Sequence, residues 1–356
     1  MLKNRRQLLR PFFEEQHLDL LLIEHPVNLR YLSGFSGSEG SLLLTADGAG
    51  WFVCDSRYTV QATAEVAGLT VLERSRRHEA VAELAGSVGA HRIGFEAAHT
   101  TVTAHRTLAE QLAGCELLPI GPELERIRDL KDAGELKLLE QVAALASAAL
   151  EAVLPGLRPG VTEAAFALEL EFEMRRRGAD ASGFDIIVAS GERGAMPHGR
   201  ASGKVIRAGE LVTIDFGAVL AGYHSDETVT VAVGEIGEEQ RRVYETVKTA
   251  HDLAIAAVKP GISCRDLDAV ARDHIAAQGY GDYFGHGLGH GVGLDIHEKP
   301  VISPRSDAVV AEGMVFTIEP GIYLPGRCGV RIEDTVAVTA DGCRLLTRID
   351  KGLKSL

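Results

Sequence analysis

The first part of the chain alternates short apolar runs with longer amphipathic stretches. The apolar runs are bounded by turn-forming residues and read LDLLLI, SLLLT, GWFVCD, LTVLE, RIGFEA and CELLPI. Between them, apolar residues recur at helical spacing around residues 57–67, 77–88 and 99–114. Alternating strand and helix signals predict a small α/β domain over residues 1–122. The polar stretch GPELERIRDLKDAGEL begins at the end of this domain.

The remainder of the chain, residues 123–356, contains an internal repeat behind a long Ala/Leu-rich helix predicted near residues 133–154. LRPGVTEAAFALELEFEMRRRGA, from Leu157, aligns without gaps on VKPGISCRDLDAVARDHIAAQGY, from Val258. In each copy a Pro-Gly turn leads to a Thr or Ser N-cap, an amphipathic helix and a closing glycine. GELVTIDFG and SDETVTV then correspond to EGMVFTIEPG and IEDTVAV. Two related halves, each helix-helix-strand-strand, predict an α+β domain with an internal pseudo-two-fold repeat.

The repeat places four acids in matching positions of the two halves. Asp215 falls on Glu319, and Asp226 falls on Glu333. If the halves pack face to face, their four carboxylates meet at one central place. A carboxylate in an apolar, β-branched run is costly to bury unless it is paired or bound to metal, and four together repel unless a cation neutralises them. A single such acid is more often a paired structural residue, but four symmetric ones are better explained by a metal site.

A glycine-rich segment with three histidines, HGLGHGVGLDIHE, spans residues 286–298. Each glycine costs a helix roughly 1 kcal/mol, so extended backbone is expected. His286 and His290 then share one face, and the bare opposite face lets another backbone or a ligand approach. A dinucleotide loop is excluded because its third glycine would fall on His290. Four carboxylates with one imidazole suit two divalent ions, which can share and activate a water.

The bulk composition limits the partners of this 356-residue chain. Its net charge of −13 argues against a nucleic-acid partner, which would call for a basic face. No apolar run approaches the ~20 residues of a membrane span, and acidic residues interrupt the N-terminal stretch where a signal peptide would lie. Five cysteines without CxxC pairs indicate reduced thiols and a cytoplasmic protein, and we interpret Cys328 as a partly buried thiol. Neither GxSxG nor GxxxxGK[ST] occurs, which disfavours a serine hydrolase or a nucleotide enzyme.

The chain resembles the pita-bread metallopeptidases, which include methionine aminopeptidase, aminopeptidase P and prolidase. The motifs that carry the resemblance are IDFGAVLAGYHSDETVTV, PHGRAS, FGHGLGHGVGLDIHE, GMVFTIEPGIY and GVRIEDT, in the family's order. The resemblance implies a pita-bread catalytic domain over residues 123–356, and a homodimer. It also implies two divalent ions, manganese before cobalt or zinc. Their ligands would be Asp215, Asp226, His290, Glu319 and Glu333.

The same resemblance implies roles for further residues. Glu319 would also transfer a proton from the attacking water to the leaving nitrogen, while His297 stabilises the oxyanion and His198 holds the substrate. Substrate contacts are expected from His286, Arg305, Tyr323 and Arg331. Arg331, two residues before Glu333 on the same strand face, could orient ligand carboxylates by bidentate hydrogen bonds. His224 is not used by the family pattern and is interpreted as a loop histidine.

The N-terminal stretches NLRYLSGFSGSEGSLLLT and WFVCDSRYTVQA resemble those of aminopeptidase P. There the N-terminal domain limits substrate size, a role open here to Asp55, Arg57 and Tyr58; a strand-end ion pair and a core tyrosine are an equally good interpretation. The resemblance implies an Xaa-Pro aminopeptidase acting on peptides with proline at the second position. Arg305 keeps open a prolidase that cuts only Xaa-Pro dipeptides. A pita-bread binding module without chemistry is disfavoured because all five ligand types are present.

Overall fold

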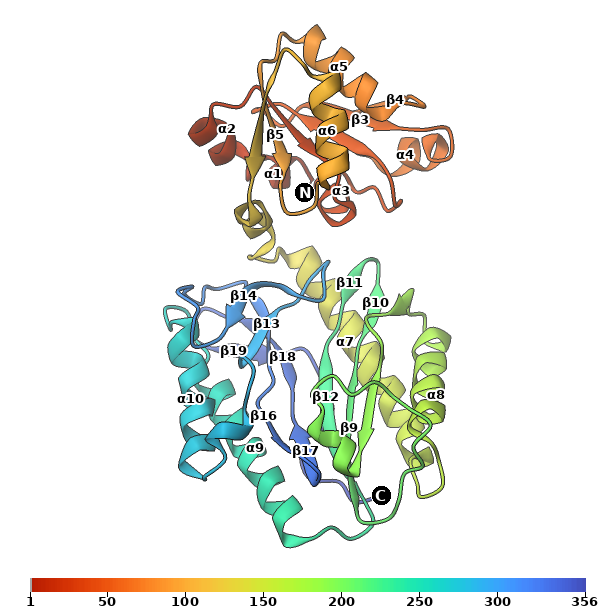
Figure 1. Ribbon diagram of the computed structural model, residues 1–356, viewed down its shortest axis with the longest axis vertical. Helices are drawn as coiled ribbons and strands as arrows, with labels where there is room; N and C mark the ends of the chain where they lie inside the picture. Colours follow the sequence, from red (N-terminus) through yellow and green to blue (C-terminus); the bar gives the residue numbers. More distant parts are fainter. Residues whose placement is uncertain (1) are drawn as a thin grey trace. The chain divides into compact units, whose positions relative to one another are not determined.

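The computed structural model describes residues 2–356 and divides into two compact units, Met1–Ile127 and Arg128–Leu356 (Figure 1). The 3₁₀ helix η1 (Pro122–Arg128) lies at the end of the first unit. It is attached to that unit because the hydroxyl of Tyr31, far earlier in the chain, donates to the carbonyl of Ile127 at 2.8 Å. The unit therefore extends past residue 122, where the sequence places the domain boundary. Each unit is described by itself below.

Unit 1 is a six-stranded sheet with helices, as the alternating pattern predicts. The strand order is β4-β3-β2-β1-β5-β6, parallel except for β2, which runs antiparallel to both neighbours. Each of the six predicted runs forms one strand. Leu20 and Leu22 of β1 share one face and pack with Val81 of α5 and Leu108 of α6. The strands are β1 Leu20–Ile23, β2 Ser41–Leu44, β3 Gly50–Cys54, β4 Thr70–Glu73, β5 Arg92–Glu96 and β6 Glu116–Ile120; the helices are α1 Leu2–Gln7, α2 Arg10–Gln16, α3 Pro26–Ser33, α4 Thr59–Glu65, α5 Arg77–Ser87 and α6 Val102–Gln111.

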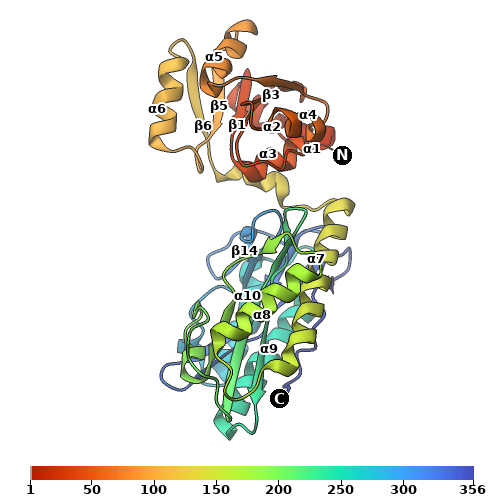
Figure 2. The ribbon, with the colours of Figure 1, turned by 90° about the vertical axis from the view of Figure 1, so that its right-hand side faces the viewer.

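Unit 2 consists of two halves, each with two helices against antiparallel strands, which confirms the predicted α+β repeat (Figures 1 and 2). The first half comprises α7 Ala133–Val153, α8 Glu163–Arg176, β7 Ala181–Ser182, β8 Ile187–Ser190, β9 Glu210–Phe216, β10 Ala218–Leu220, β11 Tyr223–His224 and β12 Glu227–Val233. The second comprises α9 Glu238–Ala257, α10 Cys264–Ala277, β13 Gly289–Gly291, β14 Glu298–Ile302, β15 Val315–Ile318, β16 Gly321–Leu324, β17 Cys328–Arg331, β18 Asp334–Val338 and β19 Cys343–Leu345. Short 3₁₀ turns are η2 Leu154–Gly156, η3 Gly191–Ala195 and η4 Gly281–Tyr283.

The repeated helix starts are built alike in the two halves. Thr162 caps α8 by accepting from the Ala165 N–H, and Ser263 caps α10 by accepting from the Asp266 N–H. The glycine of the preceding Pro-Gly turn has φ +96° at Gly160, a left-handed conformation that side chains rarely adopt. The pair β9–β12 in the first half likewise corresponds to β15–β18 in the second. Sequence similarity between the halves therefore reflects a shared supersecondary unit.

Helix α7 is long and apolar enough to pass the length and composition test for a membrane span. Half of its most apolar window is buried inside unit 2, where Val142, Ala146 and Leu150 join the core of the first half. Asp132 and Glu135 close its N-terminus with a capping box. These contacts are those of a core helix of unit 2.

Candidate active site

The strand pairings of unit 2 bring acids from both halves together. In the β9–β12 ladder Asp215 lies opposite Thr228, two residues after Asp226. Thr228 also forms a β-bridge with Glu333 of the other half, and its hydroxyl donates to Glu333 Oε2 at 2.6 Å. Glu319 follows directly on β15, the strand paired with β18. One threonine thus connects acids of the two halves at the centre of the unit.

His290 reaches these acids from β13, whose glycines allow close backbone packing. A methyl group on Gly289 would lie 1.9 Å from the carbonyl oxygen of Thr317, and one on Gly291 would lie 2.1 Å from that of Lys299. The extended backbone spans fewer residues than the motif, because a register shift interrupts the ladder between His290 and Gly291. The bare side of the strand is therefore filled by neighbouring backbone, while His290 points to the acids.

The predicted metal ligands come together in one place. Ligand atoms of Asp226, His290 and Glu333 all lie within 4.8 Å of one another. The Nε2 atom of His290 is 3.4 Å from Glu319 Oε1 and 3.5 Å from Asp226 Oδ2. Asp215 Oδ1 is buried without any hydrogen-bond partner, as expected of an atom that binds a cation. All five predicted ligands belong to this one cluster.

The electrostatics of the cluster call for added positive charge. Burial raises the pKa of Asp226 well above its usual range, and the neighbouring Glu333 carboxylate raises it further. Glu333 shows the same rise, first from burial and then from Glu319. Burial lowers the pKa of His290, which keeps its imidazole neutral, the form that binds metals. Buried carboxylates that repel one another around a neutral imidazole fit divalent cations.

The two predicted catalytic histidines lie beside this cluster. The rings of His290 and His297 meet edge-on with centroids 4.2 Å apart. Burial lowers the pKa of His297, and His290 and then His198 lower it further, so His198 is also nearby. His198 and His297 are both exposed, unlike the buried acids. They can therefore contact a substrate that enters the site.

Three predicted substrate-binding residues form one hydrogen-bonded chain. The Tyr323 hydroxyl lies 2.9 Å from His286 Nε2 and accepts from Arg331 Nη1 at 3.1 Å. Arg331 also donates to Asp215 Oδ2 and to the carbonyl of Pro197 at 3.0 Å. The carboxylate that Arg331 orients thus belongs to the opposite half of the repeat. Its contact with Pro197 links the cluster to the loop that carries His198.

Other residues named by the sequence lie apart from the cluster or differ from expectation. Arg305 is exposed in a turn after β14, and no contact within the described chain ties it to the ligands. His224 was expected in a loop but lies on strand β11, where its N–H donates to Gly293. Cys328 is 1% exposed, so it is more deeply buried than predicted. In unit 1, Arg57 pairs with Asp55 as the ion-pair interpretation expects, but Tyr58 is only half-buried and is not a core tyrosine; its hydroxyl lies 2.7 Å from the Ser38 hydroxyl.

Sequence reasoning missed the residues that hold the site in place. Thr228 and Thr317 contact the ligands Glu333 and Glu319, and each stands two residues from an acid on the same strand. That spacing puts their side chains on the ligand face and was a usable signal.

The partners of Glu298 left no such signal in the sequence. Arg128 and Lys131, at the beginning of unit 2, bind its carboxylate at 3.0 and 2.9 Å.

Comparison with known proteins gives matches over nearly the whole chain. The model of metallopeptidase family M24 matches residues 137–340, and that of the creatinase/prolidase N-terminal domain matches residues 5–130. The chain is 44% identical to the uncharacterized peptidase YqhT of Bacillus subtilis over 97% of this chain and 98% of that protein. Two solved structures align with it. The Xaa-Pro dipeptidase from Bacillus anthracis has a TM-score of 0.97, is 40% identical and is covered in full, as is this chain. The X-Pro aminopeptidase from Thermotoga maritima has a TM-score of 0.90, is 35% identical and covers 96% of this chain and 99% of its own. These matches confirm the predicted α/β domain followed by a pita-bread domain.

Proposed function

The chain belongs to metallopeptidase family M24, and on this premise we propose that it hydrolyses the peptide bond between a first residue and a following proline. The observation that carries the proposal is the cluster of Asp215, Asp226, His290, Glu319 and Glu333, whose four carboxylates outnumber the one guanidinium among them, that of Arg331, and call for further positive charge. Two divalent ions, manganese first, would supply that charge, polarise the scissile carbonyl and lower the pKa of a water toward about 7.

The residues around the cluster can divide the remaining work of hydrolysis. Glu319, whose pKa is raised by burial, is suited to take a proton from the attacking water and pass it to the leaving proline nitrogen. His297 is neutral because burial lowers its pKa, so one ring N–H can donate to the developing oxyanion. His198, which is exposed to solvent beside the cluster, would hold the leaving group.

The side chains of His286, Tyr323 and Arg331 are held together by hydrogen bonds next to the cluster of acids. We call the surface that these three side chains present the proline wall. Such a wall suits proline, because its ring has a fixed shape and its amide has no N–H to satisfy. We therefore assign proline selectivity to this wall. Substrates with other second residues would lose the shape match and bring an unpaired N–H into it.

The substrate can be either an Xaa-Pro dipeptide or a longer peptide with proline at its second position, and we propose that the dipeptide is cleaved. Support comes from the higher similarity to a protein named Xaa-Pro dipeptidase, at 40% identity, than to one named X-Pro aminopeptidase, at 35%. The motifs of unit 1 favour the aminopeptidase instead, so longer peptides form the second candidate. A cytoplasmic location, supported by five cysteines that are all free, and a homodimer, which follows from the family resemblance, complete the proposal.

The test compares Ala-Pro, Ala-Pro-Ala-Ala and the control Ala-Ala with manganese-loaded protein, identifying products by mass. Cleavage of Ala-Pro alone would support the dipeptidase and point to Arg305 as the group that recognises the substrate carboxylate. Release of alanine from the longer peptide would establish the aminopeptidase. If no Xaa-Pro bond is cut with manganese, cobalt or zinc, the proposed reaction is wrong and a binding role without chemistry comes first.

A further inference from the structure

Two of the metal ligands are each followed by a second buried acid. Asp226 precedes Glu227, which is 1% exposed, and Glu333 precedes Asp334, which is 3% exposed. Neighbouring side chains of an extended strand point to opposite faces, so these two acids point away from the metal cluster. Neither acid is needed for the proposed chemistry, which leaves their burial to be explained.

Each of these acids is adjacent in sequence to one ligand of its own half and lies opposite a neighbour of the other ligand on the paired strand. Glu227 lies opposite Phe216, the residue after Asp215, in the β9–β12 ladder. Asp334 lies opposite Ile318, the residue before Glu319, in the β15–β18 ladder. A shift of Glu227 or Asp334 would therefore move the backbone that carries the ligands of that half.

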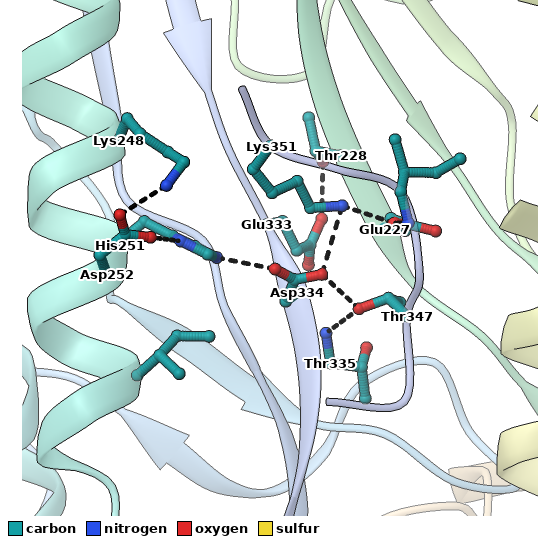
Figure 3. A network of polar contacts seen from close by, with 12 residues as sticks. Glu227, Thr228, Lys248, His251, Asp252, Glu333, Asp334, Thr335, Thr347 and Lys351 are labelled. Carbon is teal, nitrogen blue, oxygen red and sulfur yellow. Dashed lines mark hydrogen bonds and ion pairs between the residues drawn. The ribbon is translucent and has the colours of Figure 1, made fainter. Parts of the chain in front are cut away.

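A single lysine joins the two acids across the halves. Lys351 is 6% exposed; its Nζ donates to Glu227 Oε1 and lies 3.2 Å from Asp334 Oδ1 (Figure 3). Each acid has two further partners, one on the oxygen that Lys351 contacts and one on its other oxygen. These are the Ser147 hydroxyl and Ile349 N–H on Glu227, and the Thr347 hydroxyl and His251 Nε2 on Asp334.

The C-terminal segment that carries Lys351 runs from one half to the other. It leaves the second half where the Leu346 N–H donates to the carbonyl of Thr335 on β18. It reaches the first half where the Ala232 N–H of β12 donates to the carbonyl of Lys354. Between these contacts the Tyr244 hydroxyl of α9 donates to the Lys351 carbonyl at 3.0 Å. Lys351 is thus anchored where the two halves meet, behind the ligands.

We propose that Lys351 is a positioning residue for the metal centre: by holding Glu227 and Asp334 together, it sets the separation of the ligands that the two halves contribute. The inference rests on the proposed function for the identity of those ligands. Residues that orient metal ligands typically change metal affinity 10–100-fold when mutated. A merely structural ion pair would change the stability of the fold and leave the affinity of the folded protein unchanged.

The test measures Mn²⁺ binding to metal-free protein by calorimetry, in the absence of peptide, for Lys351→Met and Lys351→Arg. We expect Lys351→Met to weaken binding about 10–100-fold and Lys351→Arg, which keeps the charge, to recover most of it. Val247→Ala is the matched control, because it removes buried volume from α9 and none of the hydrogen bonds or ion pairs of the network. It should lower the melting temperature and leave the affinity for Mn²⁺ unchanged.

If Lys351→Met does not fold, the double variant Glu227→Gln, Lys351→Met removes both charges of the closest pair and serves instead. It should fold and still bind Mn²⁺ more weakly than the wild type. Wild-type affinity in either variant, or equal weakening in Val247→Ala, would overturn the proposal. Because no peptide is used, failure to cleave Xaa-Pro bonds does not affect this result, whereas a wild-type chain that binds no Mn²⁺ would overturn both proposals.

Discussion

Two buried groups of acids lie one residue apart in unit 2 and differ in how their charge is balanced. On one face, Asp226 and Glu333 have pKa values raised well above their usual range, by burial and then by other acids. On the other face, burial also acts to raise the pKa of Asp334, but Lys351 and His251 outweigh it and hold that pKa low, while burial raises the pKa of Glu227 and Lys351 counteracts part of that rise. We call the first group unbalanced, because its carboxylates repel one another and call for an added cation. We call the second group balanced, because Lys351 lies between its two acids.

The largest effect is expected where the unbalanced group takes part in chemistry. Glu319→Gln removes the charge of a proposed ligand and the group proposed to carry the proton, so kcat on Ala-Pro should fall by about 10²–10⁴-fold. Steady-state rates with saturating manganese measure the loss. Glu312→Gln, an exposed acid in the same region, is the control and should keep wild-type activity. A loss of less than tenfold in Glu319→Gln would assign the proton transfer to another group.

A buried acid whose charge is balanced by basic side chains should instead affect the free energy of unfolding when a partner is removed, and Glu298 is such an acid. Burial acts to raise the pKa of Glu298, but Lys131 and Arg128 hold it below its usual value. Lys131→Met leaves this buried carboxylate short of a partner, so the free energy of unfolding should drop by about 3–5 kcal/mol. Urea denaturation measures the drop, with the exposed Lys137→Met as control.

Metal binding distinguishes this outcome from damage to the ligand cluster. Lys131→Met should keep the wild-type number of bound ions, because Glu298 is not a ligand. Its kcat should fall, because Glu298 holds the loop that ends at His297. A variant with lost metal and unchanged stability would contradict the division into balanced and unbalanced acids.

Adding metal should stabilise the fold through the unbalanced group alone. A ligand present at 100 times its Kd stabilises the folded state by about 2.7 kcal/mol. Asp226→Asn should lose this gain, yet without metal it should be more stable than the wild type, because one repelling charge is gone. Thermal unfolding in chelator and in manganese measures both differences. Equal stabilisation of Asp226→Asn by manganese would place the ion elsewhere.

The pH dependence of the metal-free protein follows from the same raised pKa values. For an acid whose pKa is higher in the folded state, the contribution to stability is fully present below the ordinary values of 3.8 and 4.5 for Asp226 and Glu333. It is lost as the pH rises through the raised values, at up to about 1.4 kcal/mol per pH unit for each proton. Melting temperatures in chelator should therefore fall as the pH rises above the ordinary value of 4.5. Manganese should remove most of that slope, and a flat profile without metal would show that the acids are already neutralised.

The sequence predicted the features that follow local rules. The strands of unit 1 and the repeated helices of unit 2 show in apolar spacing and in the Pro-Gly turns. Asp226 and Glu333 could be matched because the repeat carries them at equivalent places. A partner chosen by tertiary packing leaves no such trace. Lys351 meets Glu227 across 124 residues, and Arg128 meets Glu298 across 170.

Local rules also failed where neighbouring backbone decided the geometry. The glycine-rich segment was expected to be extended throughout, but within residues 286–298 only Gly289–Gly291 and the last residue, Glu298, lie in strands. Arg331 shares a strand face with Glu333, yet its guanidinium binds Asp215 from the other half. Both outcomes depend on how the halves pack, which spacing within one half does not encode.

The smallest expected effect lies in the hydrogen-bonded chain of His286, Tyr323 and Arg331, which contacts the unbalanced group through Asp215. Tyr323→Phe removes a hydroxyl that contacts His286 at 2.9 Å and Arg331 at 3.1 Å. Arg331 keeps Pro197 and Asp215, so the ligands should stay in place and the number of bound ions should not change. One lost hydrogen bond corresponds to about 1 kcal/mol, or roughly fivefold in KM for Ala-Pro.

Separate values of kcat and KM decide what the Tyr323 hydroxyl does. A higher KM with kcat within twofold of wild type would make it part of the proline wall. The exposed Tyr283→Phe is the control and should change neither value. If kcat falls and metal is lost instead, the hydroxyl acts through Arg331 on Asp215, and the wall belongs to the support of the unbalanced acids rather than to substrate recognition.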